Sequence, residues 1–124
     1  MAVRIKRVYE PAQPGDGYRV LVDRLWPRGV AKGQLQVDAW LREVAPSHEL
    51  RRWFGHDPAR WEGFRQRYRQ ELAHSQAQAL LDALARRAGQ GTVTLVYSAR
   101  DEQRNQAVVL KEILDSLASG HGAT

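Results

Sequence analysis

The chain has no cysteine, which excludes a disulfide framework, a thiolate metal site and a cysteine nucleophile. Its four histidines show no metal-ligand spacing, so we expect no dedicated metal site and no cofactor. No apolar run approaches the roughly 18 residues of a membrane-spanning helix. The N-terminus lacks the apolar stretch of a signal peptide. We therefore expect a soluble cytoplasmic protein with no membrane partner.

The common phosphate-binding and hydrolase motifs are also absent. There is no Gly-x-Gly-x-x-Gly, no Walker-type Gly-Lys-Ser/Thr and no Gly-x-Ser-x-Gly. With 124 residues, the chain has the length of one small domain. We expect a single domain over residues 1–118 and a disordered tail over 119–124.

Arginine is abundant. The chain has 19 Lys and Arg against 14 Asp and Glu, and only three of the 19 are lysines. The excess of basic side chains lies in residues 1–70, which carry 14 basic and 8 acidic side chains. Residues 71–124 carry 5 basic and 6 acidic side chains. One interpretation is a genome that encodes arginine more often than lysine. The other is an anion-binding surface, because guanidinium groups bind phosphate and carboxylate bidentately.

The hydrophobic pattern alternates between strands and helices, which favours an α/β fold. We predict a single layered domain with a small, mostly parallel sheet and helices packed on both faces. The segment 92–98 is apolar or β-branched on both faces, so it should lie inside the sheet, parallel to segment 18–26. The expected elements are strands at 3–9, 18–26 and 92–98, a short helix capped by Asp38, and helices at 48–54, 58–72, 77–88 and 105–117.

The helix predicted over 58–72 carries one apolar stripe. Its large side chains follow helical spacing and should face the core, whereas Arg65 and Arg69 lie off the stripe and should be exposed. The stripe consists of Trp61, Phe64, Tyr68 and Leu72.

Polar residues follow two of the predicted strands. Ligands of open α/β sheets bind outside the carboxyl ends of the strands, so these residues are the candidate site. We assign anion binding to Arg24, Arg28 and Arg100, a flat wall to Trp26 and Tyr97, and further ligand contacts to Ser98 and Asn105. We assign candidate proton-transfer roles to Asp23, His56 and Asp101.

Each of these residues also has a structural interpretation. Asp23 and Arg24 could form an ion pair, Ser98-x-x-Asp101 matches a helix capping box, and Trp26 could fill the core. His56 is a candidate general base because Asp57 follows it, although an isolated exposed histidine more often has no role.

Long blocks of the sequence are similar to a known family. They are Arg19–Gly29 (RVLVDRLWPRG), Ala45–Ser47 (APS), Leu50–Pro58 (LRRWFGHDP) and Thr92–Asp101 (TVTLVYSARD), with Asn105 and Ala107–Leu110 (AVVL). Together they resemble the bacterial YeaO-like branch of domain of unknown function family 488 over roughly residues 3–117. The resemblance implies no established activity. Longer relatives carry a Cys-His-Arg motif after the last strand, and the absence of cysteine implies that thiol chemistry does not extend to this chain.

Two functions from different classes remain open. The first is binding of a small anionic ligand, a phosphorylated metabolite or nucleotide, at the strand ends, with or without catalysis. The second is a nucleic-acid-binding or regulatory module that uses the basic surface of residues 1–70. Its phosphate contacts would be Arg51, Arg52, Arg60, Arg65, Arg67 and Arg69. A protein-partner module is a third possibility, and the oligomeric state is not indicated.

Overall fold

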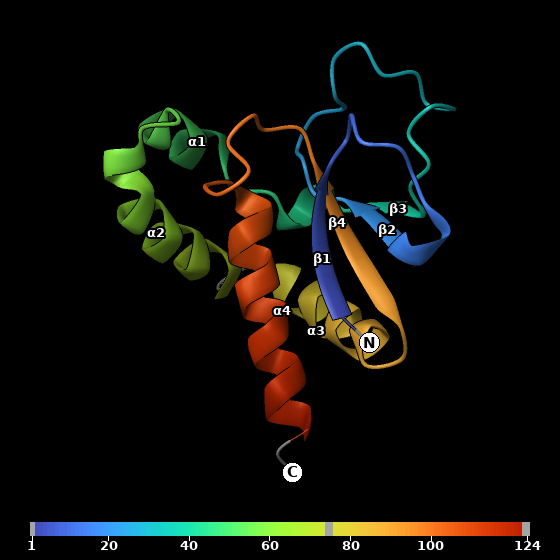
Figure 1. The fold of residues 1–124 in the computed structure, drawn as a ribbon. Coiled ribbons are helices and arrows are strands. Elements are labelled where there is room, and N and C mark those ends of the chain that lie inside the picture. Colours follow the sequence, from blue (N-terminus) through green and yellow to red (C-terminus); the bar gives the residue numbers. More distant parts are fainter. Residues whose placement is uncertain (1, 74–75, 123–124) are drawn as a thin grey trace.

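The computed structural model describes residues 2–73 and 76–122 and is built around a parallel four-stranded sheet (Figure 1). The strand order is β1-β4-β2-β3, and every neighbouring pair is parallel. This confirms the predicted α/β class and the position of segment 92–98 inside the sheet, beside and parallel to the second strand. The strands are β1 (Ala2–Arg7), β2 (Tyr18–Leu21), β3 (Ala39–Trp40) and β4 (Thr92–Tyr97).

Most predicted helices are present, with the expected signals at their ends. Ser47 caps α1 by accepting a hydrogen bond from the Leu50 amide, and Gly55 ends it in the left-handed conformation. Asp57 caps the turn before α2 in the same way. The helices are α1 (His48–Phe54), α2 (Trp61–Ala73), α3 (Ala77–Ala88) and α4 (Gln106–Gly122), and the 3₁₀ turns are η1 (Pro14–Asp16), η2 (Arg42–Val44) and η3 (Pro58–Arg60).

The three largest differences from the sequence prediction are the following. The segment after Asp38 forms β3 and η2 instead of a helix, because the Asp38 carboxylate accepts a 2.8 Å hydrogen bond from the Arg19 amide at the sheet edge. The second strand ends at Leu21, before the residues that lead into Pro27. Helix α4 runs to Gly122 and so includes residues 119–122 of the expected tail; residues 123–124 of that tail lie outside the described part of the chain.

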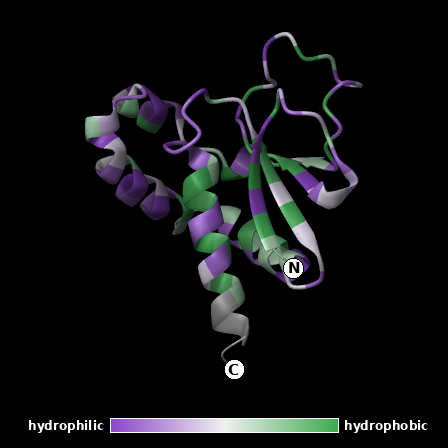
Figure 2. Ribbon diagram, viewed as in Figure 1, coloured by the Kyte–Doolittle hydropathy of each residue, from purple (hydrophilic) through white to green (hydrophobic). Residues whose placement is uncertain are grey.

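The two faces of the sheet are covered unequally. Val93, Leu95 and Tyr97 of β4 share one hydrophobic cluster with the buried residues of all four α-helices. On the opposite face, Leu21 and Val96 pack against Leu35 and other side chains of the loop between β2 and β3. Helices were expected on this face too, but the loop contains Pro27, Gly29 and Gly33, which disfavour helix formation. Hydropathy alternates along α4, as expected for a helix that covers one face (Figure 2).

The apolar stripe of α2 faces the core as predicted for three of its four members. Phe64, Tyr68 and Leu72 are buried, whereas Trp61 is partly exposed and packs on Phe64 with ring centroids 5.7 Å apart. Arg65 is less exposed than expected because it is ion-paired with two glutamates, Glu62 and Glu112.

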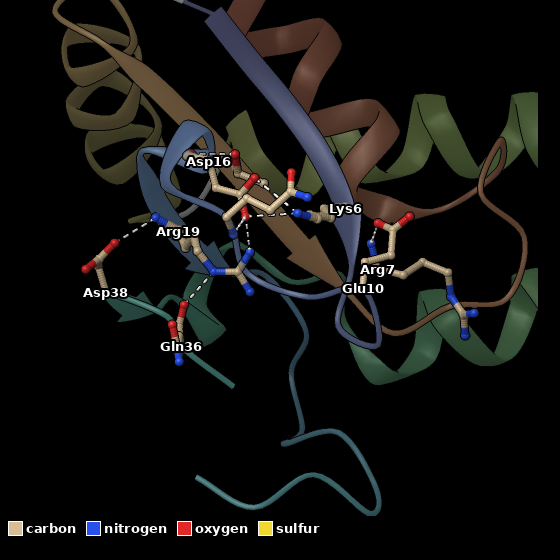
Figure 3. A network of polar contacts seen from close by, with 9 residues as sticks. Lys6, Arg7, Glu10, Asp16, Arg19, Gln36 and Asp38 are labelled. Carbon is tan, nitrogen blue, oxygen red and sulfur yellow. Dashed lines mark hydrogen bonds and ion pairs between the residues drawn. The ribbon is translucent and has the colours of Figure 1, made fainter. Parts of the chain in front are cut away.

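A buried ion network fastens η1 to the sheet (Figure 3). The Asp16 carboxylate lies 3.1 Å from Lys6 Nζ of β1 and 2.6 Å from Arg19 Nη1 of β2. Burial alone would raise the pKa of Asp16, but hydrogen bonds from the Gln13 amide, Lys6 and Arg19 outweigh it and hold this pKa below its usual value. Sequence analysis gave no indication of this network.

Candidate functional site

A pocket of about 730 Å³ opens at the carboxyl ends of β2 and β4. Because these strands are parallel neighbours, the residues that follow them reach the same edge of the sheet. The loop after β4 then leads to the start of α4 (Figure 1). The lining residues are Asp23, Arg24, Leu25, Trp26, Pro27, Arg28, Pro46, Arg51, His56, Ser98, Ala99, Arg100, Asp101 and Gln106.

Most residues of the predicted site line this pocket, and two do not. Tyr97 points into the core and is 2% exposed, and burial raises the pKa of its hydroxyl. Asn105 is a helix cap: its Oδ1 accepts from the Val108 amide at 3.1 Å, and its Nδ2 donates to the Asp101 carbonyl. Asn105 therefore supports the start of α4 without facing the pocket.

Asp23 is the most enclosed ionisable group of the pocket. It is 8% exposed, and it accepts hydrogen bonds from Ser98 Oγ at 2.5 Å and Gln106 Nε2 at 2.6 Å. Burial raises the pKa of Asp23, although both hydrogen bonds and the nearby charge of Arg51 act in the opposite direction. Asp23 is not ion-paired with Arg24, and Ser98 donates to Asp23 instead of capping α4.

Four arginines line the pocket, and within residues 2–73 and 76–122 none of them has a carboxylate ion-pair partner. Arg24 is held by the Ala45 and Pro46 carbonyls, each at 3.2 Å, which satisfy N–H groups but leave its charge uncompensated. Arg28 and Arg100 are exposed at the pocket rim. Arg51 belongs to α1 and lies near Asp23, and its Nε atom is buried without a hydrogen-bond partner among the described residues.

The carboxylates do not balance these charges. Asp101 accepts from the Gln103 and Arg104 amides and pairs with Arg104 at 3.4 Å. These contacts, the Gln103 amide first, lower the pKa of Asp101. The pocket therefore has a positive excess, which an anionic molecule would neutralise.

The remaining predicted residues, His56 and Trp26, are in the pocket wall. His56 is exposed with a φ of 57°, and the Asp57 carboxylate next to it caps the Ala59 amide, so the structure shows no His56–Asp57 pair. The Trp26 indole donates to the Val30 carbonyl at 2.6 Å and meets Trp40 edge-on at 5.4 Å. Trp26 thus forms part of the wall and also packs as a core residue.

Sequence reasoning missed Arg51 and Gln106 as pocket residues. Arg51 was grouped with the arginines of a nucleic-acid-binding face. Its spacing of three residues from the buried Phe54 was the available signal, because residues at i and i+3 share one side of a helix.

Other arginines proposed for a nucleic-acid-binding face are engaged elsewhere. Arg65 and Arg69 both pair with Glu112. Arg60 and Arg67 stack on the Trp53 ring at 5.4 and 3.9 Å. This leaves Arg52 as the member that is exposed and unpaired among the described residues.

Two kinds of site are not found in the described residues. No three His, Asp or Glu side chains there gather in a way that would hold a metal ion. In the same part of the chain, no helix has the length and apolar character needed to span a membrane.

Comparison with known proteins shows clear relatives. The profile of a family described as "Inactive DUF488-N3 subclade" matches residues 2–122. An uncharacterised protein of Mycobacterium tuberculosis is 46% identical over 113 residues, covering 91% of this chain and 93% of that protein. The uncharacterised protein YeaO of Escherichia coli is 45% identical over 118 residues, covering 94% of this chain and 100% of that protein. No solved structure matches the chain significantly.

Proposed function

The chain belongs to the family described as the inactive DUF488-N3 subclade, and we propose that it binds a small anionic molecule at the carboxyl ends of β2 and β4. A phosphorylated metabolite or a nucleotide is the expected ligand class. The observation that supports this most strongly is the set of four pocket arginines that have no carboxylate partner within the described part of the chain. Desolvated or clustered cations without counter-charges are unfavourable, so such a set is typical of a site that an anion completes.

The size and position of the pocket agree with this proposal. A volume of about 730 Å³ is suited to a metabolite or mononucleotide. The first residue of α4, Gln106, lies in the pocket wall, so the positive end of the helix dipole also favours negative charge nearby.

We favour binding without catalysis. The Asp23 carboxylate accepts hydrogen bonds from Ser98 and Gln106, and the Asp101 carboxylate accepts one from the Gln103 amide of its own turn. Among the described residues, no carboxylate orients the His56 imidazole. Asp23 and Asp101 would have to give up these contacts in order to transfer a proton. The word "inactive" in the description of the subclade points the same way.

The proposal is tested by the effect of inorganic phosphate on stability. Urea unfolding is measured at increasing phosphate concentrations, with ionic strength held constant by sodium chloride. A ligand at 100 times its dissociation constant stabilises the native state by about 2.7 kcal/mol. We expect a concentration-dependent gain for the wild type and a smaller gain for Arg28→Ala and Arg100→Ala, since each removes a rim cation.

The matched control is Arg86→Ala in α3, which removes the same charge from an exposed position outside the pocket. It should keep the full wild-type gain. No phosphate-specific gain in the wild type, or an equal gain in all variants, would overturn the proposed function. Binding of duplex DNA that is lost with Arg52→Ala, but not with Arg28→Ala, would favour the nucleic-acid alternative.

A further inference from the structure

We propose that the open edge of β1 binds an extended acidic segment of a partner protein, which adds one antiparallel strand to the sheet. The acidic side chains of this segment would face Arg4, and the apolar side chains between them would lie on the α4 face. The inference does not rest on the proposed anion site, because the cavity at this edge shares no lining residue with that pocket.

The first observation is the unpaired backbone of β1, which is the last strand on its side of the sheet (Figure 1). The Ala2 amide donates to the Gly91 carbonyl at 3.3 Å, on the side of β4. Because alternate residues of a strand direct their N–H and C=O groups to the same side, those of Val3 and Ile5 point away from β4. No strand in the described part of the chain pairs with them there, and such groups are a template for a further strand.

Glu10 closes one end of this open edge. Its carboxylate accepts a 3.0 Å hydrogen bond from the Arg7 amide (Figure 3), and its own amide donates to the Arg7 carbonyl. Arg7 is the next residue of β1 whose backbone groups point away from β4, and these groups are thus satisfied within the chain. Within β1, Val3 and Ile5 remain open. We infer an antiparallel partner because antiparallel pairing is slightly more stable per residue than parallel pairing.

The second observation is a cavity of about 480 Å³ at this edge, which four consecutive residues of β1, Val3–Lys6, line. Lys111 of α4 and Asp16 of η1 also line it, and they come from opposite faces of the sheet. Helix α4 covers the face to which Val93 points, whereas the Thr94 hydroxyl on the other face donates to the Asp16 carbonyl. A cavity that reaches both faces beside the last strand is where an added strand would lie.

The third observation is the charge of this edge. Strand β1 carries Arg4, Lys6 and Arg7 and no acidic residue. Arg4 and Lys6 are two positions apart, so their side chains share one face. Lys6 is already paired with Asp16, whereas Arg4 is exposed and has no ion pair within residues 2–73 and 76–122. An acidic side chain directly opposite Arg4 in an added strand is therefore favourable.

Charge also distinguishes this partner from a second copy of the chain. If Val3 of one copy paired with Ile5 of the other in an antiparallel ladder, the two Arg4 side chains would lie directly opposite each other. Like charges in that position are destabilising, and basic side chains on edge strands are one way in which proteins prevent such pairing. An acidic strand avoids this repulsion, and its apolar side chains would lie on the face where Ile5 is partly buried.

The backbone claim is tested with fluorescent peptides in which glutamate alternates with valine, titrated with the wild-type protein at physiological salt. In the proposed antiparallel strand, the valines lie opposite Val3 and Ile5 and direct their N–H groups toward β1, whereas the glutamates direct theirs away. A peptide N-methylated on its valines should therefore bind at least about tenfold more weakly than one N-methylated on its glutamates, although both carry the same charge. Equal affinities, the reverse order, or no saturable binding of the unmodified peptide would overturn the inference.

The charge claim is tested with Arg4→Glu and with the control Arg86→Glu, which makes the same charge change at an exposed position of α3. Arg4→Glu should bind the glutamate peptide about fivefold more weakly than the wild type does, and should bind a lysine–valine peptide more tightly. Arg86→Glu should stay within about twofold of the wild type for both peptides. Equal effects of the two substitutions would mean that net charge alone attracts the peptide, and the proposed pairing would be wrong.

Sedimentation equilibrium tests whether a second copy occupies the edge instead. Ile5→Pro removes an N–H that points away from β4, a position at which an edge strand tolerates proline. We expect Ile5→Pro to have the oligomeric state of the wild type and to bind the glutamate peptide more weakly. A wild-type dimer that becomes a monomer in Ile5→Pro would assign the edge to a second copy and contradict the acidic partner.

Discussion

Ser98 Oγ donates a 2.5 Å hydrogen bond to the Asp23 carboxylate and so connects the carboxyl end of β4 to that of β2. The same carboxylate accepts from Gln106 at the start of α4. Three elements distant in sequence therefore meet at one buried acid, which lines the same pocket as the four arginines. These hydrogen bonds hold three of the pocket-lining residues in place relative to one another.

We predict that Ser98→Ala destabilises the protein by about 1–3 kcal/mol at neutral pH, because a buried carboxylate loses a donor. Burial already raises the pKa of Asp23 in the folded state. A raised folded pKa favours the folded state at acid pH, and this contribution is lost as the pH rises through that pKa. The loss caused by Ser98→Ala should therefore be smaller at acid pH than at pH 7. Urea unfolding at both pH values measures this, and Ser98→Thr, which keeps the hydroxyl, should retain most of the stability.

We predict the opposite pH dependence for Asp16. Its pKa is lowered in the folded state, so its contribution is present above the unfolded pKa and lost as the pH falls through the folded pKa. Asp16→Asn leaves Lys6 and Arg19 buried without their carboxylate and should cost about 3 kcal/mol at pH 7. The exposed control Asp115→Asn, whose partner is Lys111, should cost less than about 0.5 kcal/mol. Equal losses for both variants in urea unfolding at pH 7 would contradict the role given to the Asp16 network.

The aromatic stripe of α2 gives a third prediction. Phe64 is 2% exposed and stacks on Phe54 at 4.6 Å, so Phe64→Ala should cost about 3–5 kcal/mol. Trp61 is partly exposed, and its truncation leaves a site that water can fill, so Trp61→Ala should cost about 2 kcal/mol. Chemical unfolding of both variants tests which of them loses more stability. A larger loss of stability in Trp61→Ala than in Phe64→Ala would contradict the packing of this stripe.

The fold was predictable where one local pattern dominated. The two-sided apolar pattern of β4, the cap at Ser47 and the stripe of α2 each depend on residues close together in sequence. Asp38 was misassigned because a carboxylate before an apolar run is a typical cap signal, whereas the Arg19 amide that it bonds is distant in sequence.

That most of the candidate site residues line one pocket was predictable for a topological reason. Parallel neighbouring strands bring the residues that follow β2 and β4 to one edge, which needs no knowledge of side-chain positions. Arg51 and the partners of Asp23 depend on how α1 and α4 pack against that edge. The spacing of Arg51 from Phe54 indicates only that both lie on one side of α1, and no local pattern says which part of the molecule that side meets, so these contacts required the structure.

An NMR titration of the ¹⁵N-labelled protein with inorganic phosphate tests the central claim most directly. We predict saturable shifts confined to the amides of residues 23–28 and 98–106 and to the Arg51 Nε–H signal, because these groups surround the pocket, whose arginines form no ion pair with the described residues. Shifts that centre instead on the arginines stacked on Trp53, or the absence of any saturable shift, would contradict the account of this pocket as an anion-binding site.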